Sequence, residues 1–169
     1  MNKILIVRTS WYEEHISKML NVSKEILEKN FECSEVIAPG ALELSALASN
    51  EISVSNNEYK GIIFLGIVIR GETSHYELVT QETFRSIGVL SDNYAHIAII
   101  NNVICVENKE QLEARVIKST TNNAHALIKL INEKQLDLSK KETRDYLNNQ
   151  LELFLDNSDH DTAEGFKEI

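Results

Sequence analysis

The sequence predicts one α/β domain with three layers: a four-stranded parallel sheet covered by helices on both faces. Three observations lead to this fold class. Ile62–Ile69 is an almost unbroken apolar run rich in β-branched side chains, as expected of a strand buried on both faces. Apolar runs of strand length alternate with segments whose apolar residues recur at helical spacing. At 169 residues, the chain can bury such a core without disulfides or a structural metal.

The first half of the chain contains two strand and helix pairs. Ile4–Val7 is a short apolar strand, and apolar residues at helical spacing from Ile16 to Asn30 predict the helix after it. Phe31–Ala38 is a partly apolar second strand that Pro39-Gly40 ends. Ala41–Ser49 follows with the apolar spacing of a helix, and a proline just before a helix is a favoured start.

The central strand leads into a turn suited to binding an anion. Residues 51–59 are expected to be a polar connection into Ile62–Ile69, and Gly71 then permits a tight turn. Thr73 and Ser74 are good caps for the next helix, which ends in turn-forming residues at 91–93. In an open α/β sheet this junction lies at the carboxyl end of the strand, where ligands bind, and the first amides of the helix point outward.

Ile97–Val106 is expected to be the fourth strand, with two helices after it. Asn108 with Gln111 resembles a helix cap and its capping partner, and Asn123–Asn132 has the apolar spacing of a last helix. Asn101-Asn102 interrupts the apolar run of the strand. Because polar residues inside a central strand need partners, this pair predicts either a ligand or a bulge.

Two motifs resemble those of a known enzyme family. Gly-x-Val-Ile-Arg-Gly-Glu-Thr-x-His-Tyr, at residues 66–76, is similar to the signature loop of the lumazine synthases, which act in the penultimate step of riboflavin synthesis. Ala38-Pro39-Gly40-Ala41-Leu42-Glu43 resembles that family's second signature, in the family's order and at about its spacing. The resemblance covers roughly residues 3–133 and implies a domain at residues 1–134 with flavodoxin-like wiring.

The resemblance also implies a reaction. It is the condensation of 5-amino-6-ribitylaminopyrimidinedione with 3,4-dihydroxy-2-butanone 4-phosphate to 6,7-dimethyl-8-ribityllumazine, phosphate and water. No metal and no organic cofactor is implied, and the sequence has no metal-ligand spacing. Much of the rate would come from holding the two substrates in line.

The family pattern places the pyrimidine substrate against several parts of the chain. An aromatic residue at the position of Trp11 packs on the heterocyclic ring, and many members have Asn where this chain has Tyr12. The family's match to Glu43 accepts hydrogen bonds from ribityl hydroxyls, a role that suits an acceptor-only carboxylate. Asn101 stands where a Phe often covers the ring, on a segment that reaches the neighbouring subunit's site. The other candidates for this substrate are Ala41, Leu42, Val68, Ile69 and Asn102.

Phosphate is expected at the start of the third helix. The amides of Glu72 and Thr73, with the Thr73 hydroxyl, make a plausible cradle. Arg115 matches the family's phosphate-binding Arg, contributed by a neighbouring subunit, and the planar charged fork of Arg suits that role. His75 matches the family's acid/base, and the helix dipole at its position disfavours the imidazolium.

The residues by themselves leave structural roles open for four of these candidates. Trp11 can pack over the end of the first helix, and the helix dipole is a sufficient reason for a carboxylate at Glu43. His75 can be a cap or a surface group, and Arg115 can be a solvated helix residue. The motif match favours the functional interpretation.

Sharing of sites implies a homo-oligomer, and the family builds pentamers. Beyond the resemblance, residues 135–169 are expected to be an acidic extension, because residues 136–169 hold nine acids and four bases. Apolar residues at helical spacing predict that it is part helical, and its polar end, Asp156–Ile169, is expected to be disordered. The apolar residues of that helix are Leu147, Leu151, Phe154 and Leu155.

Composition excludes some partners. A net charge of -9 without clustered Lys and Arg argues against nucleic acid. No run approaches a membrane span and no secretion signal is found, so a cytoplasmic protein that does not bind membranes is expected. Cys33 and Cys105 are expected to be reduced, mostly buried thiols.

Two other functions remain open from the sequence. One is a paralogue of the same fold that binds lumazine or flavin, or serves as a scaffold, without catalysis; Asn101 and the absence of an acid at Ala114 motivate it. The other is a different flavodoxin-like nucleotide or phosphate binder, which would be a monomer without a shared site.

Overall fold

The computed structural model of the chain describes residues 2–56 and 58–161, with side chains as far as residue 150. Contacts divide the chain into two compact units, Met1–Asn132 and Glu133–Ile169. The strands are β1 (Lys3–Thr9), β2 (Glu32–Ala38), β3 (Tyr59–Ile69) and β4 (Ala98–Val106). The helices are α1 (Glu13–Leu27), the 3-10 turn η1 (Ala41–Glu43), α2 (Leu44–Val54), α3 (His75–Asn93) and α4 (Lys109–Asp161).

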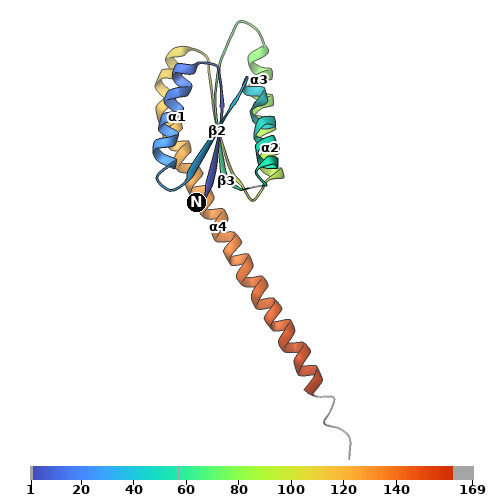
Figure 1. Cartoon of the computed structure of the whole chain (residues 1–169). Helices are drawn as coiled ribbons and strands as arrows, with labels where there is room; N and C mark the ends of the chain where they lie inside the picture. The colour runs from blue at the N-terminus through green and yellow to red at the C-terminus, as the bar shows by residue number, and fades with distance from the viewer. Residues whose placement is uncertain (1, 57, 162–169) are drawn as a thin grey trace, which may run out of the picture. The chain divides into compact units, whose positions relative to one another are not determined.

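The four strands form one parallel sheet in the order β2-β1-β3-β4. The sheet lies between two layers of helices (Figure 1). Helix α1 and the first part of α4 cover one face, where Ile4 and Ile63 meet Val116. Helices α2 and α3 cover the other face, where Leu5 and Phe64 lie in one cluster with apolar residues of both helices. The predicted three-layer α/β fold with flavodoxin-like wiring is therefore confirmed.

Helix α2 is longer than its sequence pattern indicated. The polar connection expected at residues 51–59 is wrong at both ends, because Glu51–Val54 continue the helix and Tyr59 already belongs to β3. Ile52 is fully buried in the core beneath α2, so one apolar contact extends the helix through polar neighbours.

One helix, α4, replaces the separate helices expected after β4. No Gly or Pro occurs between Lys109 and Asp161 to break it. In the polar stretch 119–123, Thr120 is buried and its hydroxyl donates to the Val116 carbonyl at 2.7 Å within the helix. The helix continues to Asp161, into the segment expected to be disordered from Asp156, and residues 162–169 of that segment lie outside the described residues.

Asn102 has partners within its own chain. Its side chain is 2% exposed; it donates to Thr120 Oγ1 at 3.0 Å and accepts from Asn123 Nδ2 at 2.7 Å, both on α4. The register between β3 and β4 runs unbroken past it. The expectation of either a ligand or a bulge was therefore wrong for this side chain, because a buried polar network on α4 satisfies it.

Within Glu133–Ile169, the described part is helical. Its exposed apolar side chains, among the residues with described side chains, are Leu136, Leu138, Tyr146 and Leu147. No helix in the part of the chain that the structure describes has the length and apolarity needed to cross a membrane.

A charged network joins β1, β2 and α1 beside the sheet edge. Arg8, which is buried, donates through Nε to Glu35 Oε1 at 2.7 Å and through Nη1 to Glu13 Oε2 at 3.1 Å. Lys24 donates to the second oxygen of Glu35 at 2.8 Å. Burial alone would raise the pKa of Glu35, but the hydrogen bonds from Lys24 and Arg8 outweigh it and hold that pKa below its ordinary value.

We expect Glu35→Gln to lower the free energy of unfolding by about 1–2 kcal/mol at pH 7. A carboxyl whose pKa is depressed by folding stabilises above its unfolded pKa, and that stabilisation is lost as pH falls through the folded pKa. The deficit of the variant should therefore shrink as urea unfolding is repeated from pH 7 down to pH 3, at one protein concentration. Glu82→Gln, which breaks an exposed pair with Arg85 on α3, is the control and should change stability by less than about 0.5 kcal/mol. If the loss of stability in Glu35→Gln did not depend on pH, the ionised Glu35 carboxylate would not be the source of the stabilisation.

Candidate active site

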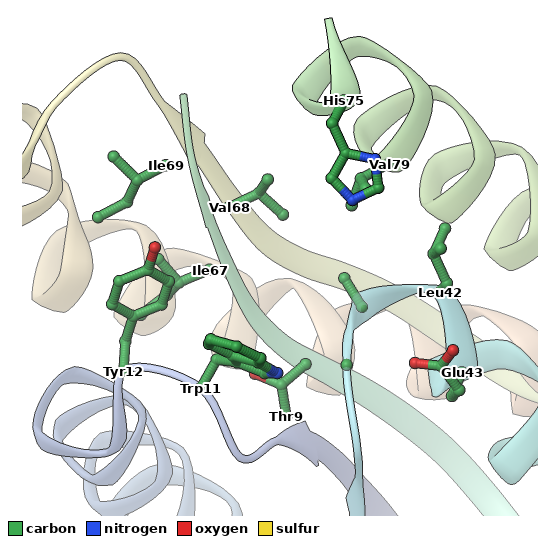
Figure 2. A pocket seen from close by; sticks show the side chains of 12 residues that line it. Thr9, Trp11, Tyr12, Leu42, Glu43, Ile67, Val68, Ile69, His75 and Val79 are labelled. Carbon is green, nitrogen blue, oxygen red and sulfur yellow. The ribbon is translucent and has the colours of Figure 1, made fainter. Parts of the chain in front are cut away.

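A hollow of about 290 Å³ lies where β1 and β3 end, on the side of the sheet that α2 and α3 cover (Figure 2). This is the carboxyl edge of the parallel strands, the usual ligand position in open α/β sheets. Three turns supply most of its wall: β1 to α1, β2 to η1, and the start of α3. The lining residues are Thr9, Trp11, Tyr12, Gly40, Ala41, Leu42, Glu43, Ile67, Val68, Ile69, His75 and Val79.

The turn from β1 into α1 presents two aromatic side chains to the hollow. Tyr12 is the residue before α1 and has left-handed backbone angles, φ 59° and ψ 48°. This conformation costs a residue other than glycine about 1–2 kcal/mol, and such strain concentrates at functional sites. Trp11 beside it is 64% exposed, so its indole does not pack over the helix end as a core residue would. The sharp turn instead holds a free ring face over the hollow (Figure 2).

At the wall formed by the turn from β2 into η1, Gly40 lets its own backbone, the Glu43 carboxylate and the Trp11 indole lie close together. A Cβ at this position would lie 3.0 Å from Glu43 Oε2 and 4.0 Å from Trp11 Nε1. Its backbone is extended, so the need for glycine is one of space and not of φ. The Glu43 carboxylate therefore folds back over Gly40 toward the indole, as the tight η1 turn after Pro39 permits.

We expect Gly40→Ala to displace the Glu43 carboxylate, because 3.0 Å is too short for an ordinary carbon contact. Ligands that use this carboxylate should bind about tenfold more weakly, while the free energy of unfolding changes by less than about 1 kcal/mol. Titration of 6,7-dimethyl-8-ribityllumazine, compared with Gly88→Ala as the control, measures this. Gly88 lies on α3 with nothing within 4 Å of an added Cβ. Unchanged ligand affinity in Gly40→Ala would show that Glu43 has room to move.

The start of α3 forms the third wall. His75 is the first residue of the helix, and its imidazole faces the hollow across from Trp11 (Figure 2). The preceding residue, Ser74, makes no side-chain cap, and the Thr73 hydroxyl instead accepts the His75 N–H at 3.3 Å. The loop at Gly71–Ser74 is exposed, which leaves its amides accessible to an anion.

Arg70 is not free to bind an anion, although it directly precedes that loop. Its Nε donates to Glu107 Oε2 at 2.5 Å, and its Nη1 donates to Glu77. The guanidinium carbon lies 4.2 Å from the centre of the Tyr76 ring. The pKa of Glu77 is lowered, chiefly by its hydrogen bond from Arg70. Arg70 thus ties the first turn of α3 to the end of β4, and its charge is already matched by two carboxylates.

The structure brings most of the candidate residues together and leaves three apart. Seven line the hollow: Trp11, Ala41, Leu42, Glu43, Val68, Ile69 and His75. Glu72 and Thr73 lie in the loop just before His75. Asn101, Asn102 and Arg115 are absent from its lining. Asn101 turns back on its own strand, where its Oδ1 accepts the Val103 N–H at 2.9 Å.

Arg115 lies on α4, exposed, and donates through Nη1 to the Gln111 carbonyl at 3.1 Å. Among the described residues that line the hollow, none is Lys or Arg. Nor do the residues with described side chains contain a group of three or more His, Cys, Asp or Glu placed to hold a metal ion. The hollow thus offers an aromatic face, a carboxylate and an imidazole, with the exposed amides of residues 71–74 in the loop before His75, and no Lys or Arg side chain among its described lining residues.

The sequence model of one family, 6,7-dimethyl-8-ribityllumazine synthase, matches residues 1–135. The chain belongs to the lumazine synthase family. It is 37% identical over 120 residues to a 6,7-dimethyl-8-ribityllumazine synthase from Agrobacterium fabrum, covering 69% of this chain and 80% of that relative. It is 34% identical over 141 residues to one from Zymomonas mobilis, covering 80% of this chain and 98% of that relative. The family consists of enzymes of riboflavin biosynthesis.

Some lining residues of this lumazine synthase family member were not among the sequence candidates. Thr9, Ile67 and Val79 line the hollow, and the sequence did not predict any of these three as a site residue. Thr9 had a readable signal: it is the last residue of β1 and alternates with Leu5 and Val7, which face α2 and α3. A polar residue at the carboxyl end of a strand, on that face, points toward the ligand edge.

Proposed function

We propose that this chain condenses 5-amino-6-ribitylaminopyrimidinedione with 3,4-dihydroxy-2-butanone 4-phosphate to give 6,7-dimethyl-8-ribityllumazine, phosphate and water. The observation that carries the proposal is the convergence of the two signature segments on one hollow. Residues 40–43 of one segment, and residues 67–69 and His75 of the other, line it together with Trp11. Membership of the lumazine synthase family supplies the substrates.

The pyrimidine substrate occupies the part of the hollow beside Trp11. The exposed indole stacks on the heterocycle, and the apolar wall of Ala41, Leu42 and Val68 excludes water from its other edge. The Glu43 carboxylate accepts hydrogen bonds from the ribityl hydroxyls. Ile69 closes the end of the hollow where β3 leaves the sheet.

The phosphate-bearing substrate lies at the start of α3. The amides of Glu72 and Thr73 bind its phosphate, and the cation comes from Arg115 of a neighbouring subunit. Two facts support this arrangement: the hollow has no Lys or Arg among its described lining residues, and the adjacent Arg70 is already held by Glu77 and Glu107. Asn101 and Asn102 contribute backbone groups of β4 to the neighbouring site, since the Asn102 side chain is committed to α4.

Positioning provides most of the catalysis. The pyrimidine amine attacks the ketone carbon, phosphate leaves, and the ring closes, and each step moves protons. His75, at the edge shared by both substrates, accepts and returns these protons. None of the described residues that line the hollow is a strong nucleophile, so holding the two substrates in line is the main contribution.

A site completed in this way requires an assembly, and we propose a cytoplasmic homopentamer. The domain exposes three large apolar side chains on α3, Leu78, Phe84 and Val89, which contacts with neighbouring subunits would cover. Cys33 and Cys105 form no disulfide, which fits a reducing compartment. The net charge of -9 is the reason to expect no nucleic acid partner.

The test is turnover of the purified chain with both substrates, followed by lumazine absorbance, after subtraction of the uncatalysed condensation. Wild-type rate above background is expected, and His75→Ala should lower kcat by about tenfold, as for a proton-transfer aid to a positioned reaction. Folded, oligomeric protein without any rate above background would overturn the synthase proposal. If such protein still binds the lumazine product tightly, the non-catalytic lumazine-binding paralogue becomes the better interpretation.

A further inference from the structure

Thr9 is a buried polar residue on the floor of the hollow. Its side chain is 1% exposed, and its Oγ1 has no hydrogen-bond partner among the residues with described side chains. It ends β1 on the face toward α2 and α3, and it lines the hollow beside Trp11 (Figure 2). A buried hydroxyl without a partner is uncommon, because it gives up its bonds to water and gains none in return.

Its position separates Thr9 from the other unpartnered groups. Buried side-chain atoms without a partner, among the described residues, are also found in Ser23, Glu77 and Thr83. None of those three residues lines the hollow. Thr9 is therefore the member of this group whose side chain lies at the hollow.

We propose that Thr9 is a substrate-binding residue whose hydroxyl forms a hydrogen bond with a polar atom of the ribitylated pyrimidine. The proposal rests on the proposed function for the identity of the substrate. The pyrimidine, and not the phosphate-bearing substrate, is the partner because Thr9 lies next to Trp11, across the hollow from His75 at the start of α3 (Figure 2).

The geometry gives Thr9 a role in specificity. A hydroxyl can both donate and accept, so it matches the carbonyl and N–H groups of a pyrimidinedione as well as the first ribityl hydroxyls. A ligand with a polar atom at this point gains a hydrogen bond from the buried Thr9 hydroxyl, whereas a ligand with an apolar group there gains none, so the site favours the first. The hydroxyl is already buried beside the indole, so water does not compete for this hydrogen bond.

The experiment compares Thr9→Val with Thr83→Val in the full chain. Both changes replace a hydroxyl by a methyl group at nearly constant shape, and both remove a buried oxygen without a partner. The dissociation constant of 6,7-dimethyl-8-ribityllumazine is measured by titration, and the KM of each substrate by steady-state kinetics. Thr9→Val should weaken lumazine binding by about fivefold to tenfold and raise the pyrimidine KM similarly, while Thr83→Val stays within about twofold of wild type.

Two further measurements distinguish binding from folding. The thermal midpoint should rise or stay constant in both valine variants, since each loses an unsatisfied polar group. Thr9→Ser should retain wild-type affinity, because it keeps the hydroxyl. Lumazine affinity of Thr9→Val within about twofold of wild type would overturn the proposal, as would equal losses of affinity in Thr9→Val and Thr9→Ser. If the wild-type protein showed no turnover, the proposed function would be contradicted instead. The lumazine titration would still decide the role of Thr9.

Discussion

Arg115→Ala is expected to lower kcat/KM for the butanone phosphate substrate by about 100-fold, because a phosphate would lose its one charged partner. Within a single subunit, Arg115 contributes little to the packing of the fold. It is exposed on α4, and its side chain donates a hydrogen bond to the Gln111 carbonyl in the same helix. Its effect on stability should be below about 0.5 kcal/mol, and the KM of the pyrimidine substrate should change little. Arg115→Lys should recover only part of the rate, since an ammonium keeps the charge and loses the planar fork.

Mixed assemblies test whether the arginine acts across a subunit boundary. Glu43→Ala removes a group within a subunit's own hollow, and Arg115→Ala removes one from the adjacent α4. If each site takes Glu43 from one subunit and Arg115 from the next, equal random mixing of the two variants restores about one site in four. Refolded mixtures should therefore reach about one quarter of wild-type activity. Each variant refolded alone is the control. Mixtures no more active than the two parents would contradict a shared site.

The fold was readable from the sequence where hydrophobic pattern and chain breaks coincide. The apolar run Ile62–Ile69 correctly predicted a strand covered by helices on both faces, and Pro39-Gly40 correctly predicted the end of β2. The pattern failed after β4, where the helix expected from Asn108 and the last helix expected at Asn123–Asn132 are parts of one helix. Thr120 and Asn123 there both form hydrogen bonds with the Asn102 side chain of β4, so their polarity serves a buried network and not a loop. Local composition cannot distinguish these cases because the partners are distant in sequence.

The site was readable only in part, for a related reason. Motif matching located the residues at the ends of β3 and β2, but it gave no sign that Arg70 is held by Glu77 and Glu107. It also missed Thr9, whose significance lies in a hydroxyl that is buried and unbonded. Both facts depend on contacts between elements. They change the roles of the residues: a nearby arginine becomes a structural tie, and a plain strand residue becomes a candidate ligand.

Trp11→Ala is expected to weaken binding of 6,7-dimethyl-8-ribityllumazine by about 10- to 100-fold, the usual loss when a ring loses its stacking partner. The indole is 64% exposed, so its removal forfeits little core packing and should leave the thermal midpoint nearly unchanged. The pyrimidine KM should rise with the dissociation constant while kcat changes less, because stacking holds substrate and product alike. Trp11→Phe should keep most of the affinity.

Trp11 also offers a direct optical readout, because it is the single tryptophan of the chain. Stacking of lumazine on the indole should quench its fluorescence in wild type, and quenching should saturate with the same dissociation constant that lumazine fluorescence gives. Tyr146→Ala is the matched control, since Tyr146 is an equally exposed aromatic residue outside the domain of the hollow. Saturable lumazine binding without quenching, together with an unchanged affinity in Trp11→Ala, would place the ligand elsewhere. The strained Tyr12 turn would then need another explanation, because the exposed ring it presents would have no ligand.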